Sequence, residues 1–448
     1  MDDPHSITQD KPQTGQRSTL LIVFLVVFID LLGFGIVLPL LPYYGLYFLK
    51  PLFPGEANEP LRGPILGLLM SSFSAMQFLF APMWGRISDR IGRRPILLLG
   101  LCGSVVFYTL FGIASEIGES GQLMAGLILL FVARLGAGIA GATISTAQAV
   151  IADITPSEGR SRGMAMIGAA FGIGFTFGPL LGFASLFVPL RGAPGFAAAL
   201  FSLIALLLAI RLLPETHPAS AEPRPRHWID WRGLQAALRM PSVGILIFIF
   251  FLATFAFGGL ESTLALINKL LLNPGGELHQ ELTLGAAKTT ERKNFLVFAY
   301  VGFVLVLANM GYRRLVKGNL EVMFLRIGSI FMGLGLAGAV GILLIRNPEE
   351  TSTGIFALGL LTMTLAVIGF ACVTPSVQSL ISRRTDPTRQ GEILGVNQSG
   401  AALARILGPF VGLSLFDVSQ SHIWPYVFGV CLIIVVFLMT LRVQQEEP

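Results

Sequence analysis

The feature that most constrains this chain is a series of apolar runs, each long enough to cross a lipid bilayer as a helix. A hydrocarbon core of about 30 Å needs about 20 apolar residues in helical form. Hydrophobic residues make up 53% of the chain and charged residues only 13%, about half the charged share of an average soluble domain. Twelve such runs can be drawn, near 18–42, 64–84, 95–115, 122–150, 162–187, 193–213, 241–267, 294–312, 322–345, 353–381, 391–416 and 421–441. We predict an all-α integral membrane protein.

The runs divide into two similar halves. The sequence Gly178-Pro179-Leu180-Leu181-Gly182 returns as Gly408-Pro409-Phe410-Val411-Gly412, and from 178 to 408 the offset is 230 residues. A repeat of six spans is typical of transporters built from two bundles, with the substrate site between them near the midplane. We predict a tail at 1–17, a six-helix bundle at 18–213, a linker at 214–240, a second bundle at 241–441 and a tail at 442–448.

Charge predicts the orientation. Most of the 31 Lys and Arg residues lie on the side of the predicted spans that carries both termini, which places that side in the cytoplasm. The net charge of +5 resides in short connections and requires no nucleic-acid partner. The two long connections on the other side, 43–63 and 268–293, are either an external vestibule or flexible padding. The three cysteines lie inside apolar runs and have neither disulfide nor metal spacing, which favours a packing role.

The connection at 85–95 is the most specific motif. It holds one acid, Asp89, and the arginines Arg86, Arg90, Arg93 and Arg94 between two apolar runs, and its glycines predict a tight turn. The pattern G-x-x-x-D-R-x-G-R-R resembles the loop between helices two and three of the major facilitator superfamily. That resemblance covers about residues 18–441, so it implies a major facilitator fold of twelve transmembrane helices in two pseudo-symmetric bundles.

In that family this loop latches the two halves of a transporter together on the cytoplasmic side. The resemblance implies that Asp153 pairs with Arg93 or Arg94, and that Asp89 faces the start of helix eleven near Gly391. The second-half loop, which includes Arg313 and Arg314, keeps the arginines and lacks the acid. The predicted latch residues are Gly85, Asp89, Arg90, Gly92, Arg93, Arg94 and Asp153.

Ionisable residues inside the spans are candidates for proton coupling, because buried charge in a membrane is costly and usually functional. Asp30 is either a proton carrier or a structural bond. Its surroundings, D-x-x-G-x-G-x-x-x-P-x-x-P, resemble helix one of tetracycline-type drug:proton antiporters. Arg134 needs a partner, and its segment resembles the superfamily's helix-four motif, in which the arginine is tied to proton coupling. Glu261 and Arg405 face the same two readings, functional or structural.

The fifth run carries a glycine and proline pattern. Gly174, Gly178 and Gly182 are spaced four apart, and Pro179 bends the helix. The segment resembles the motif G-x-x-x-G-P-x-x-G-G that marks antiporters within the superfamily. It departs from that motif at Ala165 and Phe183, and ordinary kinked packing would give a looser version of the same pattern.

These features predict a proton-coupled antiporter that exports small amphipathic molecules by alternating access, as a monomer in the bacterial inner membrane. The expected partners are the substrate, protons and lipid, with no cofactor and no metal. A uniporter or symporter that imports a nutrient, and a non-transporting membrane receptor, are the alternatives. Enzymatic activity is not expected, because no P-loop and no nucleophile–base set occurs. Tetracycline carriers have ionisable residues within their second-half spans, whereas runs eight and nine of this chain offer only Asn309 and the membrane-edge Arg326. Tetracycline itself is therefore doubtful as substrate.

Overall fold

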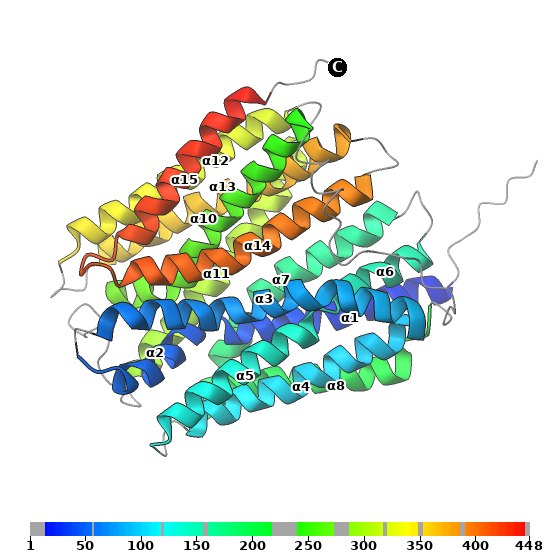
Figure 1. The fold of residues 1–448 in the computed structure, drawn as a ribbon, viewed down its shortest axis with the longest axis horizontal. Coiled ribbons are helices and arrows are strands. Elements are labelled where there is room, and N and C mark those ends of the chain that lie inside the picture. The colour runs from blue at the N-terminus through cyan, green and yellow to red at the C-terminus, as the bar shows by residue number, and fades with distance from the viewer. Residues whose placement is uncertain are drawn as a thin grey trace, which may run out of the picture.

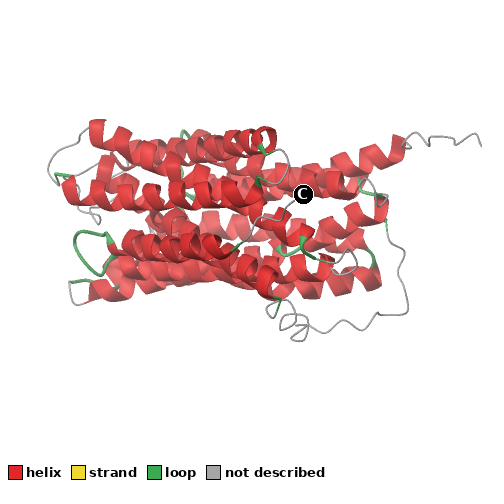
Figure 2. Cartoon of the chain, turned by 90° about the horizontal axis from the view of Figure 1, so that it is seen from above, coloured by secondary structure: helices red, strands yellow, loops and turns green. Residues whose placement is uncertain are grey.

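The computed structural model describes residues 14–55, 58–117, 121–155, 160–216, 240–272, 286–316, 320–347, 353–385 and 390–443. Over these residues the regular secondary structure is helical (Figure 2). Helices satisfy every backbone polar group within the segment, which hydrocarbon surroundings demand. The helices are α1 Thr14–Val37, α2 Leu41–Leu52, α3 Glu59–Ile91, α4 Arg93–Ile117, α5 Leu123–Gly141, α6 Ile144–Ile154, α7 Arg160–Ser185, α8 Ala193–Leu212, α10 Pro241–Leu272, α11 Ala286–Leu315, α12 Glu321–Ile345, α13 Thr353–Arg383, α14 Gln390–Phe416 and α15 Trp424–Arg442.

The helices form two bundles, α1 to α8 and α10 to α15 (Figure 1). Between the bundles, α3 packs on α14, α7 packs on α11, and α2 packs on α10. We call the end that carries Gly92 and Arg442 the basic end and the other end the Pro39 end. Within the described residues, eleven helical segments are long and apolar enough to span a membrane by length and composition, with α5 and α6 counted as one, and α7 adds the shorter apolar segment Gly172–Ser185.

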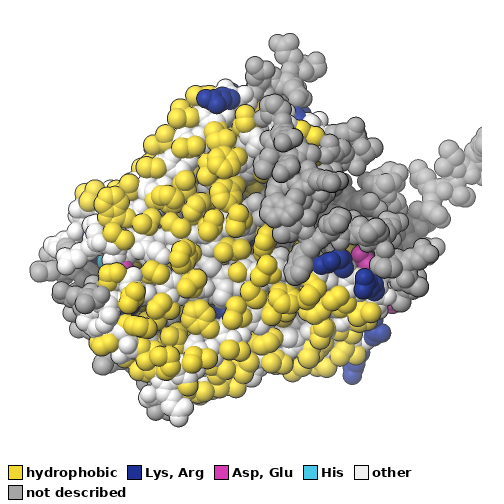
Figure 3. All heavy atoms as spheres, viewed as in Figure 1, with side chains coloured by type: hydrophobic (Ala, Val, Ile, Leu, Met, Phe, Trp, Pro, Cys, Tyr) yellow, Lys and Arg dark blue, Asp and Glu magenta, His cyan; other side chains and the backbone are white. Residues whose placement is uncertain are grey.

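The surface fits a bilayer. Hydrophobic side chains cover the face seen in Figure 3, and the Lys and Arg side chains visible there lie mainly at its margins. Many large apolar side chains, such as Leu99, Leu207 and Leu438, are more than half exposed on the helices. In water that much exposed apolar surface would drive association. The observed surface is the one expected of a multi-pass integral membrane protein.

Several predicted boundaries were wrong. The connection at 85–95 is almost wholly helical, because α3 runs to Ile91, α4 starts at Arg93, and Gly92 alone joins them with a φ of 104°. The part of the 43–63 connection nearest the first span is the helix α2, whose Tyr43, Phe48 and Leu49 are buried. These apolar and aromatic residues pack into the bundle core, so this part of the connection is neither a vestibule wall nor padding.

Other boundaries moved or lie outside the described residues. The predicted fourth span divides into α5 and α6 at Ala142–Thr143 and continues to Ile154. The first helix starts at Thr14, inside the predicted tail, and the 268–293 connection contributes helical turns at both of its ends. The remainder of that connection, most of the 214–240 linker and the rest of both tails are not among the described residues.

Candidate functional site

Arg134 lies in the middle of α5 and is the largest fully buried side chain of the described residues, with 2% of its surface exposed. Its guanidinium carbon lies 4.8 Å from the ring centroid of Phe73 in α3 and 5.8 Å from that of Phe34 in α1. Such cation–π contacts strengthen when the cation is desolvated. Among the described residues, Nε and Nη1 of Arg134 have no hydrogen-bond partner. Within the described part of the chain, the partners of this arginine are thus the aromatic rings of Phe34 and Phe73.

Asp30 lies in α1, one helical turn before Phe34, the residue that contacts Arg134. Residues four apart on a helix share a face. The side chain of Asp30 itself is outside the described part of the structure. Its predicted role in proton transfer therefore stays a prediction.

The glycine pattern of α7 is a packing surface for α1. A Cβ on Gly178 would lie 2.7 Å from the Cα of Gly35, and one on Gly174 would lie 3.0 Å from Leu31 Cβ. Pro179 lies inside α7 beside this crossing, where its ring contacts the position of Gly35. Small residues allow two helix backbones to approach closely. The segment that resembles the antiporter motif thus holds α7 against the helix that carries Asp30.

Gly182 differs from the two glycines before it. A Cβ there would overlap the ring of Phe295, which belongs to α11 of the other bundle. The predicted smooth face of α7 therefore serves two neighbours. Gly174 and Gly178 pack inside the first bundle, whereas Gly182 packs across the boundary between the bundles.

Glu261 and Arg405 are the ionisable residues predicted within the spans of the second bundle. They lie on α10 and α14 and interact electrostatically. The two helices cross at glycines, because a Cβ on Gly412 would lie 2.8 Å from the Cα of Gly259. The side chain of Arg405 is exposed although it lies in the interior of a membrane-spanning helix. An exposed charge at that depth is expected to face a water-filled space between helices.

Arg93 is the centre of the charged cluster at the basic end. Its Nη1 lies 2.5 Å from Asp89 Oδ1 and donates to Ser88 Oγ at 2.7 Å, and its Nε lies 3.1 Å from Asp153 Oδ2. Its side chain is 8% exposed. Of the two arginines considered for Asp153, the structure therefore selects Arg93. Arg94 instead donates from Nη2 to the carbonyl of Ile210 at 2.6 Å.

The other predicted latch residues are less engaged. Asp89 pairs with Arg93 of its own bundle, and its side chain is 43% exposed. The start of α14, where the contact with Asp89 was predicted, lies outside the described part of the structure, which excludes residues 386–389 and the side chains of 390–392. Arg90 is exposed, and a Cβ on Gly85 would have open space around it. A role for this cluster in latching the two bundles remains a prediction.

Sequence reasoning missed Glu215, which follows α8. Its Oε1 accepts the backbone N–H of Arg93 at 2.8 Å, and its Oε2 accepts that of Arg94 at 3.1 Å. The carboxylate thus caps the first turn of α4, where exposed N–H groups favour negative charge. A Cβ at Gly92 would collide with this carboxylate, which explains the second glycine of the motif. No spacing in the sequence joins residues so far apart.

Sequence reasoning also missed Glu321 and Arg383 at the basic end of the second bundle. Glu321 Oε1 lies 2.9 Å from Arg383 Nη2 and 3.2 Å from Ser379 Oγ, and the glutamate side chain is 3% exposed. The internal repeat contains a signal for this pair, because Glu321 lies 228 residues after Arg93 and Arg383 lies 230 after Asp153. Among the described residues, no three His, Cys, Asp or Glu side chains form a metal site.

Comparison with known proteins agrees with this architecture. The chain matches the Major Facilitator Superfamily over residues 23–367 and 323–448. It is 31% identical to the class E tetracycline resistance protein of Escherichia coli, with 95% of this chain and 94% of that protein covered. It is 30% identical to major facilitator superfamily domain-containing protein 10 of Homo sapiens, with 90% of this chain and 88% of that protein covered.

Solved structures give the same result. The crystal structure of the human organic anion transporter MFSD10 matches with a TM-score of 0.62 and 27% identity, over 95% of this chain and 99% of that one. A D-xylose-proton symporter shares the fold, with a TM-score of 0.70 at 18% identity over 96% and 98% of the two chains. The sequence motifs, the two six-span bundles and these matches lead to one conclusion. The chain belongs to the major facilitator superfamily of membrane transporters.

Proposed function

We propose that the protein is a proton-coupled antiporter that exports small amphipathic molecules, organic anions among them. The basic end would face the cytoplasm, because basic residues favour that side of a membrane. The setting would be a bacterial inner membrane and the working unit a monomer.

The observation that carries this proposal is the set of ionisable side chains at membrane depth. Arg134 is buried in the first bundle, and Glu261 and Arg405 interact electrostatically in the second. Ionisable residues in spans mark ion and substrate pathways, because hydrocarbon makes them too costly to keep for packing alone. The packing of α7 on α1 supports antiport in particular, since it joins the segment resembling the antiporter motif to the helix of Asp30.

The substrate class follows from Arg405 and from the relatives. An exposed arginine inside a span is suited to bind a carboxylate or phosphate, with which guanidinium forms paired hydrogen bonds. One relative is a human organic anion transporter, which makes an anionic substrate a reasonable first choice. Tetracycline is a weaker choice. The two polar side chains that runs eight and nine offer for it are already bonded within the protein. Asn309 donates to the carbonyl of Leu305 in its own helix, and Arg326 donates to the carbonyls of Thr440 and Val443.

The test is transport by the purified protein in liposomes with an imposed pH gradient. A library of organic anions and cations would first be screened for thermal stabilisation of the protein. We expect a stabilising anion to be accumulated against its gradient when the liposome interior is acidic, because protons then leave as substrate enters, and we expect this uptake to stop when a protonophore collapses the gradient. A substrate flux that does not depend on the pH gradient would favour a uniporter. Absence of flux together with a stable protein partner would favour a receptor.

A further inference from the structure

The first span is broken at the Pro39 end. α1 stops at Val37 and α2 begins at Leu41, so the carbonyl of Pro39 lies in a turn between two helices. Pro42 has no N–H to donate into this turn. Pro39 is buried, and backbone groups freed by such a break and shielded from water must be satisfied by other parts of the protein.

The opposite bundle supplies the missing donor. Asn294 of α11 donates from Nδ2 to the Pro39 carbonyl at 3.0 Å. Its Oδ1 accepts from Asn268 Nδ2 of α10 at 2.9 Å, which orients the Asn294 amide toward Pro39. Both asparagines are buried, with 0% of Asn294 and 4% of Asn268 exposed. The two amides thus form a chain of two hydrogen bonds that runs from the second bundle to the first.

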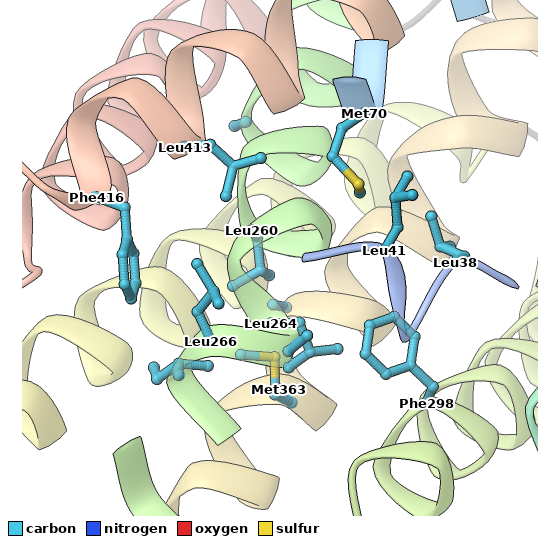
Figure 4. Close-up of a cluster of buried hydrophobic side chains, with 14 of the residues drawn as sticks. Leu38, Leu41, Met70, Leu260, Leu264, Leu266, Phe298, Met363, Leu413 and Phe416 are labelled. Carbon is cyan, nitrogen blue, oxygen red and sulfur yellow. The ribbon is translucent and has the colours of Figure 1, made fainter. Parts of the chain in front are cut away.

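A second bond crosses the same boundary in the reverse direction. Tyr43, in the first turn of α2, donates from its hydroxyl to the carbonyl of Ala265 in α10 at 2.8 Å. Apolar side chains of both bundles form one buried cluster, part of which Figure 4 shows, and Tyr43 belongs to it. It includes Leu38, Leu41 and Met70 from the first bundle and Leu264, Phe298 and Leu413 from the second. We call the bonds of Asn294 and Tyr43, with this cluster, the Pro39 seam.

We propose that the Pro39 seam is a gate: its two bonds, from Asn294 oriented by Asn268 and from Tyr43, hold the Pro39 end closed. In alternating access this end must open in one state, and the two bundles then separate at Pro39 and Ala265. A bond made in only one of two states shifts the balance between them, whereas a bond made in both shifts nothing. One neutral hydrogen bond corresponds to a change of about 3- to 10-fold in that balance. This inference requires alternating access alone and is independent of proton coupling and of the substrate.

The test measures the separation of the bundles directly. Spin labels would be placed at Leu61 and Val418, which are exposed near the Pro39 end on different bundles, in a protein whose native cysteines are replaced. Distances would be recorded by pulsed electron resonance in lipid discs without substrate or pH gradient. We expect Asn294→Leu and Tyr43→Phe each to raise the population with this end open by about 3- to 10-fold.

Two matched controls lie inside single bundles. Asn309, also in α11, donates to Leu305 of its own helix, and the hydroxyl of Tyr426 donates to Thr263 within the second bundle. Asn309→Leu and Tyr426→Phe should leave the distances unchanged. Unchanged distances in both seam variants, or the same shift in the controls, would overturn the proposal. If Asn294→Leu does not fold, Tyr43→Phe, which removes a single oxygen, decides the question.

Discussion

Glu321 and Arg383 form, at the basic end of the second bundle, the same contact that Arg93 and Asp153 form in the first, with the charges exchanged. The distances are 2.9 Å for the first pair and 3.1 Å for the second. Each pair joins the start of one helix to the end of a later one. The first pair joins α12 to α13, and the second joins α4 to α6. A serine bonds to the buried member in each case, Ser379 to Glu321 and Ser88 to Arg93. The two bundles therefore share a geometry that does not depend on the sign of the charges.

We expect the Glu321–Arg383 pair to be energetically coupled. Glu321 is buried, so Arg383→Gln should leave its carboxylate with Ser379 and lower the free energy of unfolding by about 1–3 kcal/mol. In Glu321→Gln the charge is gone, and the further change Arg383→Gln should then cost much less. A double-mutant cycle of denaturation in detergent measures the difference. Strictly additive effects would show that the contact is incidental.

The cap on α4 gives a second prediction. Glu215→Ala removes the acceptor of two N–H groups and should lower stability by about 0.5–2 kcal/mol, the usual range for a lost helix cap. Glu116 is a suitable control, because its Oε1 accepts the N–H of Gly192 at 2.6 Å at the start of α8. Both variants should lose stability. If Glu215 also positions Arg93, only Glu215→Ala should slow transport markedly, and equal transport rates in the two variants would contradict that role.

Arg134 should be needed for transport more than for folding. Arg134→Ala removes a cation that lies against two aromatic rings and should slow transport at least tenfold. Arg134→Lys keeps the charge but not the planar group that lies over the rings, so we expect partial recovery. Initial transport rates and melting temperature would be measured on the same preparations. A melting temperature that falls in step with the rate would assign Arg134 a structural role.

Asp30 is the residue to test for coupling. Asp30→Asn keeps the size of the side chain and removes its ability to exchange a proton, so transport driven by a pH gradient should stop. Exchange of labelled for unlabelled substrate needs no net proton movement and should persist in the variant. Wild-type pH dependence in Asp30→Asn would exclude Asp30 as the carrier, and loss of both activities would indicate a structural role.

The sequence alone determined the membrane class, the two bundles of six spans and the charged cluster at the basic end. These properties are local, because a hydrocarbon core accepts only long apolar helices and because a motif such as that at 85–95 is read from neighbouring residues. The internal repeat added the correspondence between the halves. The family followed from the same motifs.

Only the tertiary structure decided which groups meet. Glu215 accepts the backbone N–H groups at the start of α4, Gly182 packs on Phe295, and Asn294 donates to the carbonyl of Pro39. No local pattern in the sequence encodes contacts across such separations. The tertiary structure also showed that α2 is a buried helix where the sequence suggested a connection, because Tyr43 bonds to the other bundle and Tyr44 bonds within its own. Such contacts depend on how rigid helices pack side by side, and packing is set by the shapes of all neighbours at once.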